Sequence, residues 1–144
     1  MDTQSAPVAL LAIKPRFAEA ILAGRKKVEF RKVRFAKTPK YIVLYASTPI
    51  QQVIAFCEVV EIQEQTVLGL WRKHRARSGI EYNEFLAYYG ERKRGYGIIV
   101  GSIWKLHRPA SLREICARSV PPQNFQYLSA FSIARLRRRR VSRL

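Results

Sequence analysis

The chain has 144 residues, 48% of them apolar, which is enough for one domain with a buried core and argues against wholesale disorder. Lys and Arg number 27 against ten Asp and Glu, so the net charge is +17. A field of that sign concentrates polyanions, of which nucleic acid is the commonest in cells. A basic surface that serves only solubility, or that binds anionic membranes, is the weaker alternative.

Six of the arginines fall within the last ten residues, so the rest of the chain still carries a net charge of +11. No apolar run approaches the roughly 18–20 residues of a membrane span. No basic segment precedes a hydrophobic run as it does in a secretory signal. We therefore expect a soluble cytoplasmic protein whose partner is nucleic acid and not a membrane.

The first half of the chain predicts mainly strands. Pro15 stands where a first helical residue would, and Gly24 stands where a helix would end. In residues 27–31, apolar and ionisable side chains alternate, which is typical of a half-buried strand. In chain order the patterns predict a strand, a helix and three strands: Val8–Ile13, Pro15–Ala23, Lys27–Arg31, Tyr41–Ala46 and Val53–Ile62.

The second half predicts two helices, a long strand and a short helix. We expect helices over Glu64–His74 and from Ser78 to Tyr89, the second with a capping box formed by Ser78 and Glu81. The strand covers Tyr96–Leu106. Ser111 and Glu114 repeat the capping-box spacing at the start of the short helix, which leads to Cys116.

Short strands interrupted by helices, with few βαβ units, favour an α+β fold over a parallel sheet. We expect a small closed or half-closed β-barrel with short helices packed at its ends. The expected organisation is a flexible N-terminus over residues 1–7, a folded domain over 8–128 and a basic tail over 129–144. The arginine-rich part of that tail, Arg135–Arg143, is predicted to be mostly disordered.

One stretch, Gly24–Arg31, gathers polar residues of several kinds. Gly24 lets the chain leave the helix in a left-handed conformation. Glu29 and Arg31 lie two residues apart on one strand face, so they can pair with each other or with Lys26. Such a group suits a base edge plus a phosphate, because Glu accepts from an exocyclic amine while Arg and Lys hold the anion. A surface salt-bridge network without a ligand is the alternative.

This stretch matches G-x-K-x-x-E-x-R at every fixed position, and it resembles the signature of the ASCH domain family. The helix end Ile21–Gly24, the segment Tyr45–Pro49, Gly95–Gly97 and Pro121–Gln123 also resemble that family, over roughly residues 8–128. The resemblance implies a PUA-like β-barrel that binds RNA or single-stranded or modified nucleotides, with RNA favoured over DNA and no cofactor or metal. The ligand-binding residues that it implies are Gly24, Lys26, Lys27, Glu29, Arg31, Tyr45 and Ser47.

Recognition of a base outside a duplex needs an aromatic wall, for which the candidates are Tyr45, Trp71, Tyr96 and Trp104. Two enzymatic alternatives also follow from the resemblance, because some ASCH proteins are ribonucleases and others are amidohydrolases that act on acetylcytidine. If the chain is an enzyme, the candidate catalytic residues are Lys26 and Glu29: both would serve a ribonuclease, whereas the catalytic lysine of the amidohydrolases corresponds to Lys26. The amidohydrolases have a threonine where Glu29 stands, and their catalytic glutamate falls near Ser78 and Glu81.

Four further residues carry weaker signals. His74 and His107 could assist a ribonuclease, although each stands alone in the sequence. Cys57 and Cys116 form no CxxC pair, and we expect both to be buried small hydrophobes. The sequence leaves the oligomeric state open.

Overall fold

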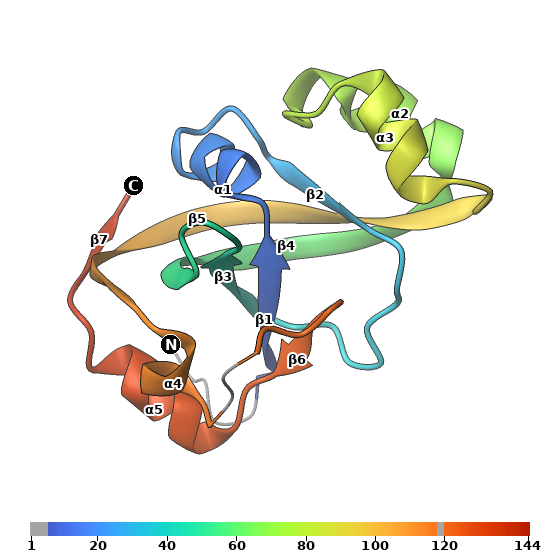
Figure 1. Ribbon diagram of the computed structural model, residues 1–144. Helices are drawn as coiled ribbons and strands as arrows, with labels where there is room; N and C mark the ends of the chain where they lie inside the picture. The colour runs from blue at the N-terminus through green and yellow to red at the C-terminus, as the bar shows by residue number, and fades with distance from the viewer. Residues whose placement is uncertain (1–5, 118–119) are drawn as a thin grey trace.

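The computed structural model describes residues 6–117 and 120–144 of the chain. Most of the predicted flexible N-terminus, residues 1–7, therefore lies outside the described residues. Seven strands and six helical segments follow one another in the order shown in Figure 1: β1 (Val8–Ile13), α1 (Pro15–Leu22), β2 (Val28–Arg31), β3 (Tyr41–Ala46), β4 (Gln52–Thr66), α2 (Val67–His74), η1 (Arg75–Arg77), α3 (Tyr82–Tyr89), β5 (Arg94–Ala110), α4 (Leu112–Ile115), β6 (Gln126–Tyr127), α5 (Ala130–Arg137) and β7 (Val141–Arg143).

The strands form one mixed sheet in the order β2-β5-β4-β3-β1-β6, and β7 pairs with the far half of β5. Only β1 and β3 run parallel among the described pairs, and the chain between them forms α1 and β2. The α+β class predicted from the sequence is confirmed. The barrel is not confirmed, because the hydrogen-bonded path runs from β2 to β6 without closing. Strong twist in the long β4–β5 pair, which carries three register shifts, curves the sheet.

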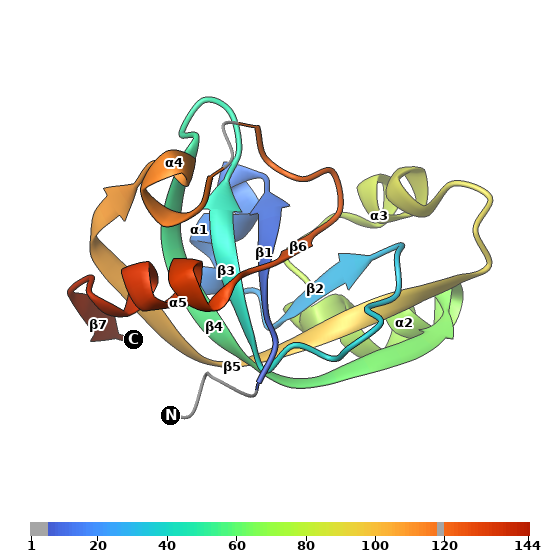
Figure 2. The ribbon, with the colours of Figure 1, turned by 90° about the horizontal axis from the view of Figure 1, so that it is seen from below.

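Both faces of the central strands are buried, which explains why β1 and β3 read as continuous apolar runs. Alternate residues of these strands face two different hydrophobic clusters. On one face Ala18 and Ile21 of α1 cover the sheet. Figure 2 shows α4 and α5 on the other face, where Ile115, Ile133 and Leu136 are buried. A third cluster joins β2 to α2 and α3.

The predicted strand over 8–13, helix over 15–23 and strands over 27–31 and 41–46 agree with the structure within a residue. The helix predicted from Glu64 begins at Val67 instead, because β4 continues to Thr66. The Thr66 hydroxyl then caps the helix by accepting from the Gly69 N–H at 3.0 Å. No helix of the described residues is long and apolar enough to cross a membrane.

One of the two predicted capping boxes is wrong and the other is confirmed. The helix after Ser78 starts at Tyr82 with Glu81 as its N-cap, so Ser78 belongs to the preceding turn and its hydroxyl donates to the Arg75 carbonyl at 2.9 Å. Ser111 and Glu114 form the reciprocal pair at the start of α4. The Ser-x-x-Glu spacing alone does not distinguish a serine in a turn from a serine that caps a helix.

The prediction of a disordered arginine-rich tail is also wrong. Residues 130–137 form α5, whose Ile133 and Leu136 pack into the second cluster. β7 then pairs with β5, with Val141 opposite Leu106. Apolar side chains interspersed among the arginines supply the buried surface that orders this segment.

Candidate functional site

The site begins at the end of α1, where Gly24 takes a positive φ of 81° as predicted. The N–H groups of Arg25 and Lys26 both donate to the Ala20 carbonyl, at 3.0 and 3.1 Å. This tight turn ends the helix and sends the Lys26 side chain inward instead of into solvent. Lys26 is 1% exposed, and a lysine is almost never buried to this degree unless it is paired.

Lys26, Glu29 and Arg31 form one buried ionic network. The Lys26 Nζ donates to the Ser78 carbonyl at 2.5 Å and lies 3.6 Å from the Glu29 carboxylate. The same carboxylate accepts from Arg31 at 3.1 Å. Arg31 also donates to the carbonyls of Ala12 and Asn124. The motif residues thus link β2 to β1, to the turn before α3 and to the segment before β6.

Burial lowers the pKa of Lys26, and the Glu29 carboxylate acts in the opposite direction. The ammonium also lies 5.0 Å from the centre of the Phe17 ring and 5.6 Å from that of Phe30. These two rings and the Ser78 carbonyl stabilise the charged form. The Lys26 ammonium is therefore surrounded by groups that interact with its charge.

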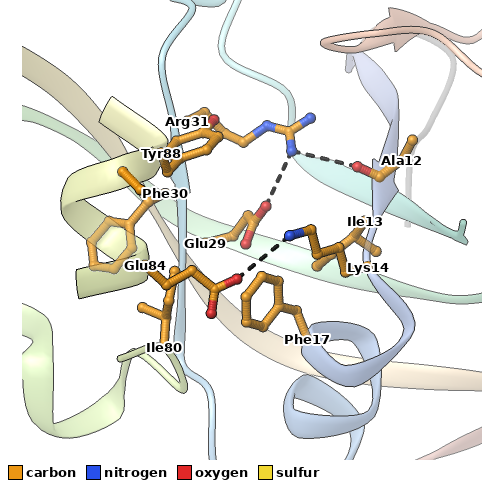
Figure 3. A pocket seen from close by; sticks show the side chains of 11 residues that line it. Ala12, Ile13, Lys14, Phe17, Glu29, Phe30, Arg31, Ile80, Glu84 and Tyr88 are labelled. Atoms are coloured by element: carbon orange, nitrogen blue, oxygen red, sulfur yellow. Dashed lines mark hydrogen bonds and ion pairs between the residues drawn. The ribbon is translucent and has the colours of Figure 1, made fainter. Parts of the chain in front are cut away.

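A pocket of about 410 Å³ lies between α1, β2 and α3. Glu29 and Arg31, whose side chains are only 7% and 12% exposed, form its floor, and the apolar walls include Phe17, Ile80 and Tyr88. Figure 3 shows Glu84 of α3 facing Lys14, which precedes α1, across the pocket. The pocket therefore offers flat apolar surfaces together with two carboxylates and two cations.

The structure brings only some of the sequence-predicted ligand residues to this pocket. Glu29 and Arg31 line it, whereas Lys26 lies behind Glu29 and is not among the lining residues. Lys27 is exposed, and its backbone N–H donates to the Arg77 carbonyl at 2.8 Å. The Gly24 backbone forms the turn but does not line the cavity.

Tyr45 and Ser47 lie apart from the pocket. Tyr45 is 4% exposed and packs into the second cluster, on the opposite face of the sheet from α1. The backbone N–H of Ser47 donates to the Ile13 carbonyl at 2.9 Å, which ties the end of β3 to the end of β1.

The other aromatic candidates do not wall the pocket either. Trp104 stacks on Phe56 with ring centres 5.2 Å apart, and Trp71 packs 5.0 Å from Phe85. Tyr96 lines a separate hollow beside the segment between β2 and β3.

Four residues that line the pocket were not predicted from the sequence: the aromatic side chains of Phe17 and Tyr88, and the charged side chains of Lys14 and Glu84. The residues of α3 lie about 60 to 70 positions from α1, so nothing local in the sequence signals their proximity. The nearest signal was the catalytic glutamate of the amidohydrolases, which the resemblance placed near Ser78 and Glu81. Glu84, one helical turn beyond Glu81, is the carboxylate that reaches the pocket.

Neither histidine lines this pocket. His107 is exposed on β5 and bonds the Ser142 hydroxyl at 2.6 Å. His74 lies against Phe30, with ring centres 6.4 Å apart, and contacts the Gln63 side chain at 2.9 Å. Burial, followed by the charge of Lys73, lowers the pKa of His74 below its ordinary value of 6.5.

This lowered pKa predicts a loss of stability in mild acid. The unfolded chain binds the His74 proton more readily, so the free energy of unfolding declines as the pH falls below 6.5 toward the folded pKa. Thermal melts between about pH 7.5 and 5.5, where histidine titrates, should show a falling melting temperature. The fall should be smaller in His74→Gln. Equal falls in both proteins would contradict the assignment.

Both cysteines are buried, as predicted, and burial raises the pKa of the Cys57 thiol to about 12. Within residues 6–117 and 120–144, no group of three or more His, Cys, Asp or Glu side chains could hold a metal ion.

Comparison with known proteins places this chain in a family. The ASCH domain model matches residues 11–105. An ASCH domain-containing ribonuclease of Zymomonas mobilis is 27% identical over 127 residues, which cover 83% of each chain. ATP synthase subunit alpha of Ureaplasma parvum is 27% identical over 124 residues, but the match spans only 15% of its length.

The crystal structure of the ASCH protein from Zymomonas mobilis superposes with a TM-score of 0.85 at 26% identity, covering 94% of this chain and 96% of that one. The fold thus agrees with the family match. The chain belongs to the ASCH domain family.

Proposed function

We propose that the chain binds single-stranded RNA and takes the base of one nucleotide into the pocket between α1, β2 and α3. The observation that carries this proposal is the pairing of Glu29 and Arg31 at the floor of a pocket walled by Phe17 and Tyr88. An aromatic wall stacks on any base that lies outside a duplex. The carboxylate accepts from an exocyclic amine, and the guanidinium donates to a ring nitrogen or carbonyl.

Size and charge support the same proposal. The volume of about 410 Å³ lies within the range of about 300–1,000 Å³ that is usual for small-ligand sites. The Glu29 carboxylate disfavours a phosphate at the floor of the pocket, so the base is the part of a nucleotide that fits there. The net charge of +17 then attracts the phosphates to the surrounding surface.

A second candidate is metal-independent ribonuclease activity, and the near full-length relative named as a ribonuclease favours it. Cleavage of RNA without a metal needs a base for the 2′-hydroxyl and a cation for the phosphorane. Glu29 or Glu84 with Arg31 or Lys14 would supply these groups, because all four line the pocket. The amidohydrolase alternative has less support, because it needs substrate to reach Lys26, which is 1% exposed.

Glu29→Gln should change which base the chain prefers, because an amide donates where a carboxylate only accepts. Competition among four labelled homopolymeric RNA oligomers should show a shift in relative affinity of about 1–3 kcal/mol. Glu91→Gln removes the same charge from an exposed loop and is the matched control. Circular dichroism of each variant checks that it is folded.

Three results would count against parts of this proposal. Failure of the wild type to retain any RNA at about 50 mM salt would refute nucleic-acid binding. An unchanged base preference in folded Glu29→Gln would refute the pocket as the base site. Product formed by the wild type from labelled RNA or from acetylcytidine, and lost in Glu29→Gln, would make the protein an enzyme.

A further inference from the structure

An ion cluster closes one side of the pocket mouth. The Glu84 carboxylate of α3 accepts from both terminal nitrogens of Arg16, one of them at 2.8 Å, and lies 3.5 Å from the Lys14 ammonium. Lys14 is the N-cap residue of α1 and Arg16 lies in its first turn, and Figure 3 shows the Lys14 side chain facing Glu84. These ion pairs connect α3 to the start of α1, the two elements on either side of the proposed base site.

The members of this cluster differ in their exposure. The side chains of Arg16 and Lys14 are 58% and 61% exposed, whereas that of Glu84 is 26% exposed. Arg16 also lies 4.5 Å from the centre of the Phe17 ring, which is one wall of the pocket. A group attached to a base that stacks on Phe17 would therefore emerge beside the two cations.

The pairing geometry suits a phosphate as well as a carboxylate. The two terminal nitrogens of a guanidinium form the same parallel hydrogen bonds with either anion, and a phosphate carries more charge. Arg16 and Lys14 are more than half exposed, so solvent screens their attraction to Glu84. A phosphate held at the mouth by its own base forms the same pair of hydrogen bonds with Arg16 and can therefore displace Glu84.

We propose that Arg16 and Lys14 form a phosphate subsite at the pocket mouth, and that Glu84 occupies it until a nucleotide displaces the carboxylate. This inference rests on the proposed function, because the base in the pocket is what brings the phosphate to the mouth. Glu84 then has a selective role. Glu84 competes for Arg16 and Lys14 with free phosphate, and it is displaced by the phosphate of a nucleotide whose base is already bound in the pocket.

Titration calorimetry with nucleosides and their 5′- and 3′-monophosphates tests this subsite through the ratio of the two affinities. The wild type should bind at least one monophosphate about tenfold more tightly than the nucleoside, on the scale of a charge-assisted hydrogen bond. Arg16→Ala should bring this ratio close to one. Glu84→Gln should raise it about three- to tenfold, because the cations lose their competing anion.

The double variant Arg16→Ala with Glu84→Gln should behave like Arg16→Ala, because Glu84 acts through Arg16. Arg108→Ala, which removes one exposed charge from the far part of β5, is the control and should leave the ratio near its wild-type value. A ratio that is unchanged in both Arg16→Ala and Glu84→Gln would overturn the subsite.

Orthophosphate as a third probe separates this inference from the proposed function. Arg16-dependent binding of orthophosphate by Glu84→Gln, in which the competing carboxylate is gone, without any binding of nucleosides would support the phosphate subsite and refute the base pocket. Nucleoside binding with a monophosphate-to-nucleoside affinity ratio that is the same in wild type and Arg16→Ala would support the pocket and refute the subsite. Absence of binding by all three probes would refute both.

Discussion

Lys26→Ala should lower the free energy of unfolding by about 3–5 kcal/mol, which is the usual cost of breaking a buried ion pair by removing one partner. The substitution leaves the Glu29 carboxylate buried with Arg31 alone, and it leaves the Ser78 carbonyl without its donor. It also removes the stem on which the turn before α3 rests. A Cβ placed at Gly79 would lie 3.4 Å from both the Cγ and the Cδ of Lys26, which alanine lacks.

Urea denaturation of Lys26→Ala and Lys26→Met separates the charge from the stem. Methionine keeps most of the packing against Gly79 and the Phe17 and Phe30 rings, so its loss of stability should be smaller. Lys27→Ala is the matched control, because this neighbour is exposed, and it should stay within about 0.5 kcal/mol of wild type. A Lys26→Ala protein as stable as Lys27→Ala would contradict the structural role.

The double variant Lys26→Met with Glu29→Gln should be less stable than Lys26→Met, because Lys26→Met leaves Glu29 paired with Arg31, whereas the second change takes the carboxylate away from Arg31. The network also explains how a residue hidden behind the pocket still determines its shape. Lys26 holds Ser78, the chain continues into α3, and α3 delivers Glu84 and Tyr88 to the pocket.

The local elements of the fold were predictable because each has a local cause. Pro15 and Gly24 bound a helix whatever lies around them, and continuous apolar runs mark strands that are covered on both faces. The closure of a barrel has no local cause, since it depends on whether strands far apart in sequence pair. The sequence therefore predicted the strands but not the open path from β2 to β6.

The candidate site divides in the same way. Glu29 and Arg31 were predicted to pair because a strand places residues two apart on one face, and they lie 3.1 Å apart. The contributions of Phe17, Glu84 and Tyr88 needed tertiary information. In α3, Phe85 and Tyr89 of the predicted aromatic face are buried, whereas Tyr82 and Leu86 are each 40% exposed. Glu84 and Tyr88 face the pocket from outside that pattern.

The arginine-rich end of the chain shows how composition can mislead. Six arginines in ten residues predicted a disordered arm, yet Ile133 and Leu136, three positions apart on α5, are 8% and 6% exposed. Two buried aliphatic side chains and a short strand outweigh the repulsion among exposed cations, because those cations remain in solvent.

Deleting residues 129–144 should therefore lower the free energy of unfolding by at least about 3 kcal/mol, since burial of two aliphatic side chains alone contributes about that much. Further loss should follow from uncovering Tyr41 and Leu106.

Replacing Arg138 and Arg140 together by Gln removes charge but no buried surface. This variant should bind RNA more weakly, and the slope of log affinity against log salt concentration should fall by about two. Its melting temperature should not change comparably. Comparing the two proteins by denaturation and RNA titration separates packing from electrostatics. If the deletion unfolded at the same urea concentration as the whole chain, α5 and β7 would contribute charge alone, and the second cluster would have to be stable without its cover.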